Sequence, residues 1–506
     1  MNSTPSVAAT AFRDALNVLR DLEFDDPRST LPLQMERLDF PLHTRERYEI
    51  HGEFEFRDDL AKPRPPRKLT TAPTIVQARR DLDENKVSCI ELLEDSIAAM
   101  NRVKDLGAIV YFDEGVSRSQ AKTLDRELAK GQLRGPLHGI PLSVKDIIDV
   151  ANMQTLGGSL AYQGHPDHDA QSVGILRQAG ALLFAKAATH EFALGVTTPQ
   201  CRNPYDPTRI SGGSSGGSAI AVSCGIGLGS LGTDTRASLR VPASLCGVVG
   251  FKPSFDAVPT KGIVPLSWTI DHIGPIARTV ADAWLILEIL MGRDPTDPFP
   301  ARTGQRKIVL GVLDFALLEA DDEVAGPVAA AIRELIGPNY KIENGTGVTK
   351  RDFEVANALG LLVSRSEASA FHRGQGTNLD LCIDEVRDQL RAAADIRAVD
   401  YLDAQRQRKI LGEKVMSAFE NFDVLVMPTT PVVAPPHSDY ENYLLRLSRN
   451  AILWSLMGNP AISIPCGSTA SGLPVGLQLV AAPGNEALLA RVGIDLERRL
   501  GTNVER

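Results

Sequence analysis

Residues 211–244 read SGGSSGGSAIAVSCGIGLGSLGTDTRASLRVPAS, a stretch with two serine-bearing loops rich in small residues. Ser214 lies in the first loop and Ser238 in the second, 24 positions later, with an apolar segment between them. Glycine suits places where the backbone passes close to a ligand or takes a positive φ. Two such loops, each with a hydroxyl and N–H groups, indicate a site that attacks a carbonyl carbon and stabilises the resulting oxyanion.

Two other interpretations of these loops fit less well. A phosphate-binding loop of the Walker type needs a lysine before Ser or Thr, and residues 211–218 contain none. A nucleophile elbow matches GxSxG at residues 212–216, but it requires a strand that runs into the serine. The preceding residues 203–210, NPYDPTRI, are typical of turns. An elbow also needs a downstream histidine, and only His272, His372 and His437 are available.

A lysine is the third option for the base. Lys145 directly follows the apolar residues 140–144, IPLSV, which predict a short strand. Burial beside such an apolar segment can desolvate the lysine side chain, which lowers the lysine pKa and makes it a usable base. The same position also suits a surface lysine at the end of a strand, so the spacing alone leaves both interpretations open.

Composition sets broad limits on the protein class. The chain has 506 residues, of which 43% are hydrophobic and 23% charged, values that are ordinary for a globular protein. A net charge of −9 argues against nucleic-acid binding, and apolar runs fall short of the roughly 20 residues of a membrane helix. The first residues show no secretory pattern, and six scattered cysteines predict reduced, buried thiols. We therefore expect a cytoplasmic protein with no membrane or nucleic-acid partner.

The chain divides into an N-terminal arm, residues 1–68, and a regular domain, residues 69–506. The arm contains an amphipathic helix candidate at 11–22 and ends in a Pro-rich linker, KPRPPR. In the domain, strands are predicted at 140–144, 181–185, 228–231, 307–313, 424–427, 461–465 and 475–480. Helices are predicted after the capping boxes Thr74/Gln77 and Ser88/Glu91, after Asp169, and over 279–291, 322–336, most of 352–419, and 485–500. The alternation predicts an α/β fold with a large sheet covered on both faces by helices.

The chain resembles the amidase signature family of serine hydrolases. The matching motifs are GIPLSVKDIIDV, the GGS at 157–159, HEFALGVTT, RNPYDPTRISGGSSGGSA, LGTDTRASLRVPASLCGVVGFKPS, DHIGPIARTVADA, DVLVMPTTPVVAPP, NPAISIPCG and GLPVGLQLV. They occur in the family's order from about residue 69 to the C-terminus. The resemblance implies the family's fold, with a large mixed central sheet, and a variable helical region at about 301–423.

The resemblance also implies a Ser–cis-Ser–Lys triad and a hydrolase of a small or medium organic amide, carbamate or ureido compound. Ser238 would be the nucleophile, Ser214 the bridging serine after a cis peptide bond, and Lys145 the base. Ser215 and Thr233 would support these groups through hydrogen bonds. The family uses no metal or organic cofactor, and its members are often dimers, so a homodimer is one option.

The oxyanion loop departs from the family pattern. By resemblance, the N–H groups of the loop would form the oxyanion hole, at Thr235, Arg236, Ala237 and Ser238. The usual loop reads TDTGGS, whereas Arg236 and Ala237 replace both glycines here. Neither replacement removes an N–H donor, but a positive φ at either position would strain the loop. We expect Arg236 to face the pocket wall or a neighbouring loop and to narrow substrate choice, or else to face solvent or a carboxylate.

Other departures concern the substrate. Ala188 stands where the family often has asparagine, at a position that can shape the acyl pocket, and Arg240-Val241-Pro242 differs from the Arg-Gln-Pro of the glutaminase component of the tRNA-dependent amidotransferase. That glutaminase function remains an alternative, as does a family member whose altered loop impairs catalysis. Pocket candidates near family motifs are Trp268, Ile270, Trp454 and Met457, which core packing would equally explain. The sequence does not name the substrate.

Overall fold

A computed structural model of the chain describes residues 7–22, 63–293 and 306–501. Its centre is a mixed sheet of 11 strands. In their order across the sheet, the strands are β1 (Ile109–Phe112), β3 (Leu182–Ala187), β2 (Pro141–Lys145), β4 (Gly229–Asp234), β6 (His272–Ala277), β5 (Val249–Lys252), β10 (Ala461–Ser468), β11 (Pro474–Val480), β9 (Val424–Pro428), β7 (Ile308–Val312) and β8 (Tyr340–Glu343).

The pairing of the strands is partly parallel and partly antiparallel. Strand β2 runs parallel to both β3 and β4, and β7 runs parallel to β8 and β9. Every other pair in the described sheet is antiparallel. Strands β2, β3 and β4 are buried along their whole length, which requires cover on both faces of the sheet.

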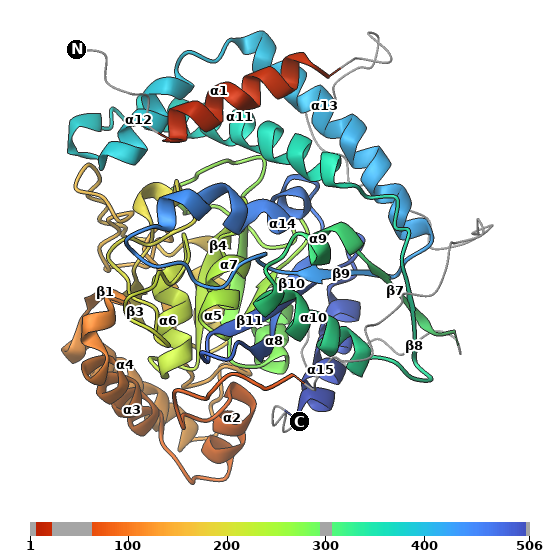
Figure 1. Cartoon of the computed structure of the whole chain (residues 1–506). Helices are drawn as coiled ribbons and strands as arrows, with labels where there is room; N and C mark the ends of the chain where they lie inside the picture. Colours follow the sequence, from red (N-terminus) through yellow and green to blue (C-terminus); the bar gives the residue numbers. More distant parts are fainter. Residues whose placement is uncertain (1–6, 23–62, 294–305, 502–506) are drawn as a thin grey trace.

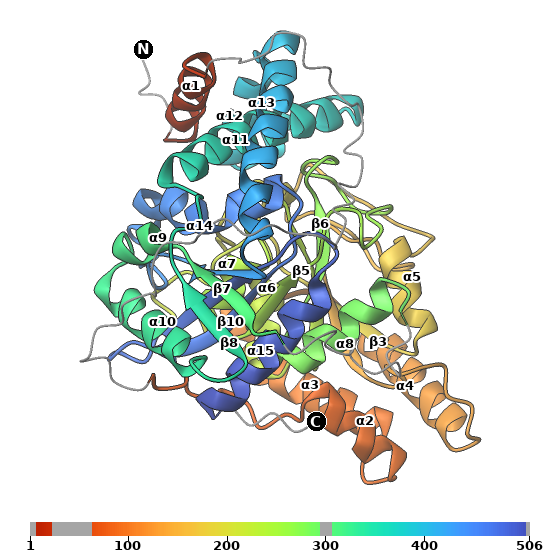
Figure 2. The same cartoon turned by 90° about the vertical axis from the view of Figure 1, so that its right-hand side faces the viewer.

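Helices supply that cover and confirm the predicted α/β class. Helices α8 and α15 pack against each other, α8 on β5 and β6 and α15 on β10 and β11. Helices α6 and α7 also pack against each other, α7 on β5, β10 and β11 and α6 on β2, β3, β4 and β6. Figures 1 and 2 show α11, α12 and α13 stacked beyond α14, on the α7 side. The helices are α1 (Val7–Arg20), α2 (Ile75–Asp83), α3 (Cys89–Arg102), α4 (Glu114–Leu128), α5 (Gln171–Gln178), α6 (Gly216–Cys224), α7 (Arg240–Leu245), α8 (Val280–Leu290), α9 (Asp314–Leu318), α10 (Asp322–Glu334), α11 (Lys350–Gly374), α12 (Asp384–Ala393), α13 (Ala398–Ser417), α14 (Leu444–Leu456) and α15 (Glu486–Leu500).

The predicted helix starts are partly confirmed. Ser88 and Glu91 form a complete capping box at the start of α3. Thr74 accepts the N–H of Gln77 at the start of α2, but the Gln77 side chain turns to Asp81 instead of completing the box. The prediction that Asp169 caps a helix is wrong, because its carboxylate is used by the Ala151 N–H and by the Arg177 guanidinium.

Four strands were not predicted: β1, β5, β6 and β8. Strand β6 contains Gly274 and Pro275, which are normally poor strand formers. Gly274 is needed there because a Cβ would come within 2.1 Å of the Phe251 carbonyl oxygen on β5. The other three strands are four residues long, too short for a periodic pattern.

Part of the predicted N-terminal arm can be compared with the structure. Residues 1–6 and 23–62 of the arm lie outside the described residues, as do residues 301–305 of the variable region. The predicted helix at 11–22 corresponds to α1, which packs on α11, α12 and α13 of the variable region. Residues 63–74 have no regular structure, and their carbonyl oxygens at Arg64 and Arg67 accept hydrogen bonds from Ser468 and Tyr205. The division at residue 68 stays a prediction.

Candidate active site

Lys145 is the last residue of β2 and is completely buried. Its ammonium donates hydrogen bonds of 2.7 Å to both Ser214 Oγ and Thr233 Oγ1. Burial lowers the pKa of Lys145 to about 7, and the carboxylates of Asp234 and Asp271 oppose part of this shift. At neutral pH a substantial fraction of this lysine is therefore unprotonated and able to accept a proton. Of the two interpretations left open by the sequence, the structure supports the desolvated lysine.

Ser214 lies on the loop before α6, where no described strand runs into it. The peptide bond between Gly213 and Ser214 is cis, as the resemblance implies. Gly213 has no room for a side chain, because a Cβ would lie 1.8 Å from the Thr197 carbonyl oxygen. The next residue, Ser214, accepts the hydrogen bond from Lys145.

Ser215 connects the two serine loops. Its N–H donates to the carbonyl oxygen of Ser238 at 3.2 Å. Its hydroxyl donates to the carbonyl oxygen of Thr233 at 3.2 Å and accepts the N–H of the same residue at 3.4 Å. The structure thus brings Ser215 and Thr233 together with Lys145, Ser214 and Ser238, the five residues expected to act in catalysis or to support it.

The loop after β4 is fixed by a buried ion pair. Asp234 and Arg240 are both fully buried and lie 3.0 Å apart. Burial alone would raise the pKa of Asp234, but the adjacent Arg240 guanidinium holds it well below its usual range. The same carboxylate accepts the N–H of Leu239, and the Thr235 hydroxyl donates to Asp271 at 2.5 Å. Both ends of the loop are therefore anchored to charged or polar groups in the core.

The N–H groups expected to form the oxyanion hole are available. Within the described part of the chain, none of the four backbone N–H groups of residues 235–238 donates a hydrogen bond. Arg236 and Ala237 both have negative φ, so replacing the family's glycines does not strain the backbone. Ala237 is fully buried against Val196 and Val241, which gives its methyl group a packing role.

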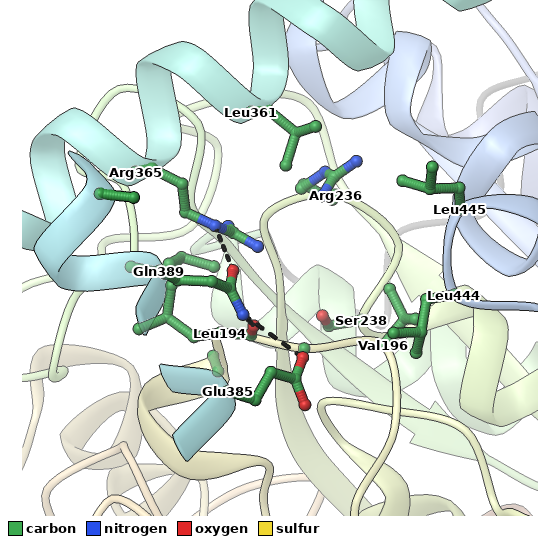
Figure 3. A pocket seen from close by; sticks show the side chains of 14 residues that line it. Leu194, Val196, Arg236, Ser238, Leu361, Arg365, Glu385, Gln389, Leu444 and Leu445 are labelled. Carbon is green, nitrogen blue, oxygen red and sulfur yellow. Dashed lines mark hydrogen bonds between the residues drawn. The ribbon is translucent and has the colours of Figure 1, made fainter. Parts of the chain in front are cut away.

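A pocket opens over Ser238. Ser238 is 3% exposed and lines this pocket together with Arg236 of the same loop. Most of the remaining lining comes from the loop before the first serine and from α11, α12 and α14: Ala193, Leu194, Gly195, Val196, Leu266, Leu361, Arg365, Glu385, Gln389, Ala392, Leu444 and Leu445. Figure 3 shows Ser238 below Arg236 and Leu361, with Arg365 and Gln389 to one side. The pocket is mainly apolar around the serine hydroxyl.

Arg236 faces the pocket wall, the first of the two options given by the sequence. Its side chain is only 7% exposed and donates a hydrogen bond to Asn357 Oδ1 on α11. Burial lowers the pKa of Arg236 to about 9, and the nearby positive charge of Arg365 adds to this effect. The guanidinium is paired with an amide, and no described carboxylate lies within 4.0 Å.

The four residues expected to contact substrate, Trp268, Ile270, Trp454 and Met457, are not among the residues that line this pocket, and their contact with substrate stays a prediction. Ile270, Trp454 and Met457 belong to a core cluster between the sheet and the outer helices, where Trp454 packs edge-on against Phe353. Trp268 is 50% exposed. These positions lie near family motifs in sequence, but three of the side chains pack in the core and that of Trp268 is half exposed. Ala188 is fully buried and is also outside the lining of this pocket.

Sequence reasoning missed the residues that α11, α12 and α14 bring to the pocket. Gly195 and Val196 were within reach, because they belong to the motif HEFALGVTT. Arg365, Glu385 and Gln389 carry no motif, and only the packing of the variable helices reveals them.

The histidines and possible metal ligands give no competing site among the described residues. The side chains of His272, His372 and His437 hydrogen-bond to Asp234, Thr377 and Cys201 respectively, and none bonds either serine. All six cysteines are free and buried, as predicted. Across residues 7–22, 63–293 and 306–501, no group of three or more His, Cys, Asp or Glu could hold a metal ion. In the same residues no helix is long and apolar enough to cross a membrane.

Comparison with known proteins places this site in context. The family model described as Amidase matches residues 91–490. An amidase of Pseudomonas putida is 33% identical over 458 residues, which cover 85% of this chain and 96% of the relative. A glutamyl-tRNA(Gln) amidotransferase subunit of Roseiflexus sp. (strain RS-1) is 33% identical over 471 residues, which cover 84% of this chain and 96% of the relative.

Solved structures share the architecture. A crystal structure of an amidase superposes with a TM-score of 0.78 at 36% identity, covering 85% of this chain and 100% of the other. Native peptide amidase from Stenotrophomonas maltophilia superposes with a TM-score of 0.72 at 27% identity, covering 85% and 97% of the two chains.

Proposed function

The chain belongs to the amidase signature family of hydrolases, and from this premise we propose that it cleaves the C–N bond of a small or medium organic amide, carbamate or ureido compound. The observation that carries the proposal is the buried contact of 2.7 Å between Lys145 Nζ and Ser214 Oγ, beside a pocket that contains Ser238. A lysine whose pKa is about 7 can serve as a base without a histidine. The proposed nucleophile, bridging serine and base are Ser238, Ser214 and Lys145.

The first half of the proposed reaction forms an acyl-enzyme. Neutral Lys145 accepts the proton of Ser214, which takes the proton of Ser238 as its oxygen bonds to the carbonyl carbon. The N–H groups of residues 235–238 stabilise the negative charge on the former carbonyl oxygen. When the C–N bond breaks, the relay returns the proton from Lys145 through Ser214 to the leaving amine.

The second half releases the acid. Water gives a proton to the same relay and attacks the acyl carbon, and the bond to Ser238 Oγ breaks as that oxygen regains a proton. Lys145 ends the cycle neutral, so one water is consumed and one amine and one acid are produced. This scheme uses only protein groups.

A fluorophosphonate probe tests the proposal directly. We expect labelling at Ser238, and strong loss of labelling in Lys145→Ala and Ser214→Ala variants that keep the native circular dichroism spectrum. Folded wild-type protein that resists labelling would support the alternative of a family member with impaired catalysis. A panel of aliphatic amides, aryl amides, indoleacetamide-like compounds, ureido acids and carbamates then narrows the substrate class.

A second candidate function is glutamine hydrolysis as part of an amidotransferase. The similarity to the Roseiflexus amidotransferase protein over 84% of the chain favours it. Release of ammonia from glutamine that rises when another protein co-purifies would support this function. Glutamine that is hydrolysed more slowly than other amides would favour the stand-alone hydrolase.

Location and assembly are further proposals. Six free, buried thiols are typical of a reducing compartment, which supports the cytoplasm. A homodimer stays a prediction, and light scattering coupled to size-exclusion chromatography measures the mass that decides it.

A further inference from the structure

Two buried arginines lie over the proposed nucleophile. Arg236 comes from the loop that carries Ser238, and Arg365 comes from α11. Both line the pocket, and their exposed fractions are only 7% and 5%. Figure 3 shows Arg365 extending from α11 toward the centre of the pocket, with Arg236 on the adjacent loop above Ser238. Two positive charges therefore share one small, largely apolar space.

The partners of both guanidinium groups are neutral. Arg236 donates to the Asn357 amide oxygen, and its Nε atom is buried without a hydrogen-bond partner in the described part of the chain. Arg365 donates to Gln389 Oε1 at 2.6 Å and to the Ser364 hydroxyl at 3.2 Å. Among the described residues, no carboxylate oxygen lies within 4.0 Å of either guanidinium. Buried charges without a counter-ion are costly, so this pair is most stable when an anion occupies the pocket.

One acidic side chain, Glu385 of α12, is part of the pocket lining. Its carboxylate lies 3.5 Å from His190 Nε2 and 3.3 Å from Gln389 Nε2, so these neighbours already hold it in place. Burial alone would raise the pKa of Glu385, but the hydrogen bond and charge of His190 and the charge of Arg365 lower it overall. Glu385 therefore interacts mainly with His190 and Gln389, and it forms no ion pair with either pocket arginine in the described part of the chain.

The rest of the pocket lining is mainly apolar. It consists mainly of aliphatic side chains: Ala193, Leu194, Val196, Leu266, Leu361, Ala392, Leu444 and Leu445. An apolar wall favours a hydrocarbon body, and two buried guanidinium groups without a carboxylate partner favour an anionic group on that body. Arginine also presents the planar donor pair that a carboxylate accepts.

We infer that this site takes an amide that bears a carboxylate on an aliphatic body, with the carboxylate held between Arg236 and Arg365 while the amide carbon meets Ser238. This substrate class deepens the proposed hydrolase function and rests on it for turnover. The binding of the carboxylate does not need catalysis, so it can be tested by itself.

The test measures binding to full-length protein with Ser238→Ala, by isothermal titration calorimetry. The probes are the monoamides of the dicarboxylic acids from malonate to adipate, each compared with its diamide, which replaces the carboxylate by a neutral group of similar shape. We expect at least one monoamide to bind about tenfold tighter or more than its diamide, as a charge-assisted hydrogen-bond pair would give. Equal affinities at every chain length would overturn the inference.

Substitutions of the two arginines test whether they cause the difference in affinity between monoamide and diamide. Arg365→Gln and Arg236→Gln, each added to Ser238→Ala, should reduce the monoamide-to-diamide ratio about tenfold, and Arg365→Lys should restore part of it. Arg446→Gln removes the same charge from α14, where the side chain pairs with Asp321 outside the pocket, and should keep the ratio. A ratio that falls equally in Arg446→Gln would mean a general charge effect and would refute the site.

The hydrolase proposal is judged by a separate result. Labelling of wild-type Ser238 by the fluorophosphonate, together with equal affinities for monoamide and diamide, would keep the hydrolase and refute the carboxylate pocket. Absence of labelling with a high affinity ratio would keep the pocket and refute the hydrolase.

Discussion

Thr233→Val should move the acid limb of the activity profile to lower pH. Valine has nearly the shape of threonine, so the change removes the 2.7 Å hydrogen bond from Lys145 Nζ while it keeps the buried volume. A hydrogen bond to a charged donor contributes about 1.5–3 kcal/mol, and one between neutral groups about 0.5–1.5 kcal/mol. The difference, about 1–1.5 kcal/mol, is the preference of Thr233 for the ammonium form of Lys145. Since one pH unit corresponds to about 1.4 kcal/mol, the midpoint should fall by about one unit.

The sign follows from which form of the lysine reacts. The base must be neutral, so kcat/KM rises with pH and levels off above the Lys145 pKa of about 7. In the variant the lysine loses its proton at lower pH. At pH 6 the neutral fraction should rise from about one tenth to about one half. The activity at pH 6 relative to pH 8 should therefore increase, even where the absolute rate is lower.

The assay is the rate of fluorophosphonate labelling, or kcat/KM for any amide that is hydrolysed, between pH 5 and 9. Thr430→Val is a matched control, because Thr430 is buried and contacts Ser244 away from the lysine. The control should keep the wild-type midpoint. A midpoint in Thr233→Val that stays in place or rises would show that Lys145 does not set the limb, and the reasoning from its hydrogen bonds would fail.

Three further changes test the surroundings of the site. Gly213→Ala puts a Cβ 1.8 Å from the Thr197 carbonyl oxygen, so urea unfolding should show a loss of about 1–3 kcal/mol or more, and an unchanged midpoint would contradict the packing. Arg240→Met leaves the Asp234 carboxylate buried without its partner, and the free energy of unfolding should fall by about 3–5 kcal/mol. A loss below about 1 kcal/mol would mean that the ion pair adds little. Ala237→Gly should lower stability by about 1 kcal/mol without faster labelling of Ser238, because the alanine already has a negative φ; faster labelling would show that the methyl group obstructs the site.

The sequence pattern predicted the α/β class and most long elements, because these have local causes, whereas the mixed sheet was implied by the resemblance to the family. Ser88 and Glu91, three residues apart, form a capping box that predicts the start of α3. The apolar run before Lys145 predicts β2. Elements whose stability comes from distant packing were missed. Strand β6 holds Gly274 and Pro275 because it pairs on both sides, with β4 and β5, and no local rule contains that information.

In the candidate site, too, residues with a local sequence pattern were predicted, and residues brought in by distant packing were not. Its two serines lie in loops with local sequence patterns, so they were found directly, whereas Lys145 is 69 positions before Ser214 and needed the resemblance to the family to be chosen. Most residues that line the pocket were not predicted from the sequence. Trp454 is near a family motif, yet the period of α14 turns it into the core, while Leu444 and Leu445 of the same helix reach the pocket.

The conformation of the loop explains why Arg236 and Ala237 can replace the two glycines of the family pattern. The family's glycines are not needed for backbone conformation, since Arg236 and Ala237 have negative φ and the N–H groups of residues 235–238 are available. The proposed mechanism therefore uses the backbone of this loop to hold the oxyanion, and the proposed carboxylate site uses the Arg236 side chain. Because Arg236 is joined to α11 through Asn357, a change in the variable helices can alter substrate choice without moving the peptide groups around Ser238. Under these two proposals, the backbone of the loop has a fixed chemical role, while its side chain belongs to a pocket that can vary.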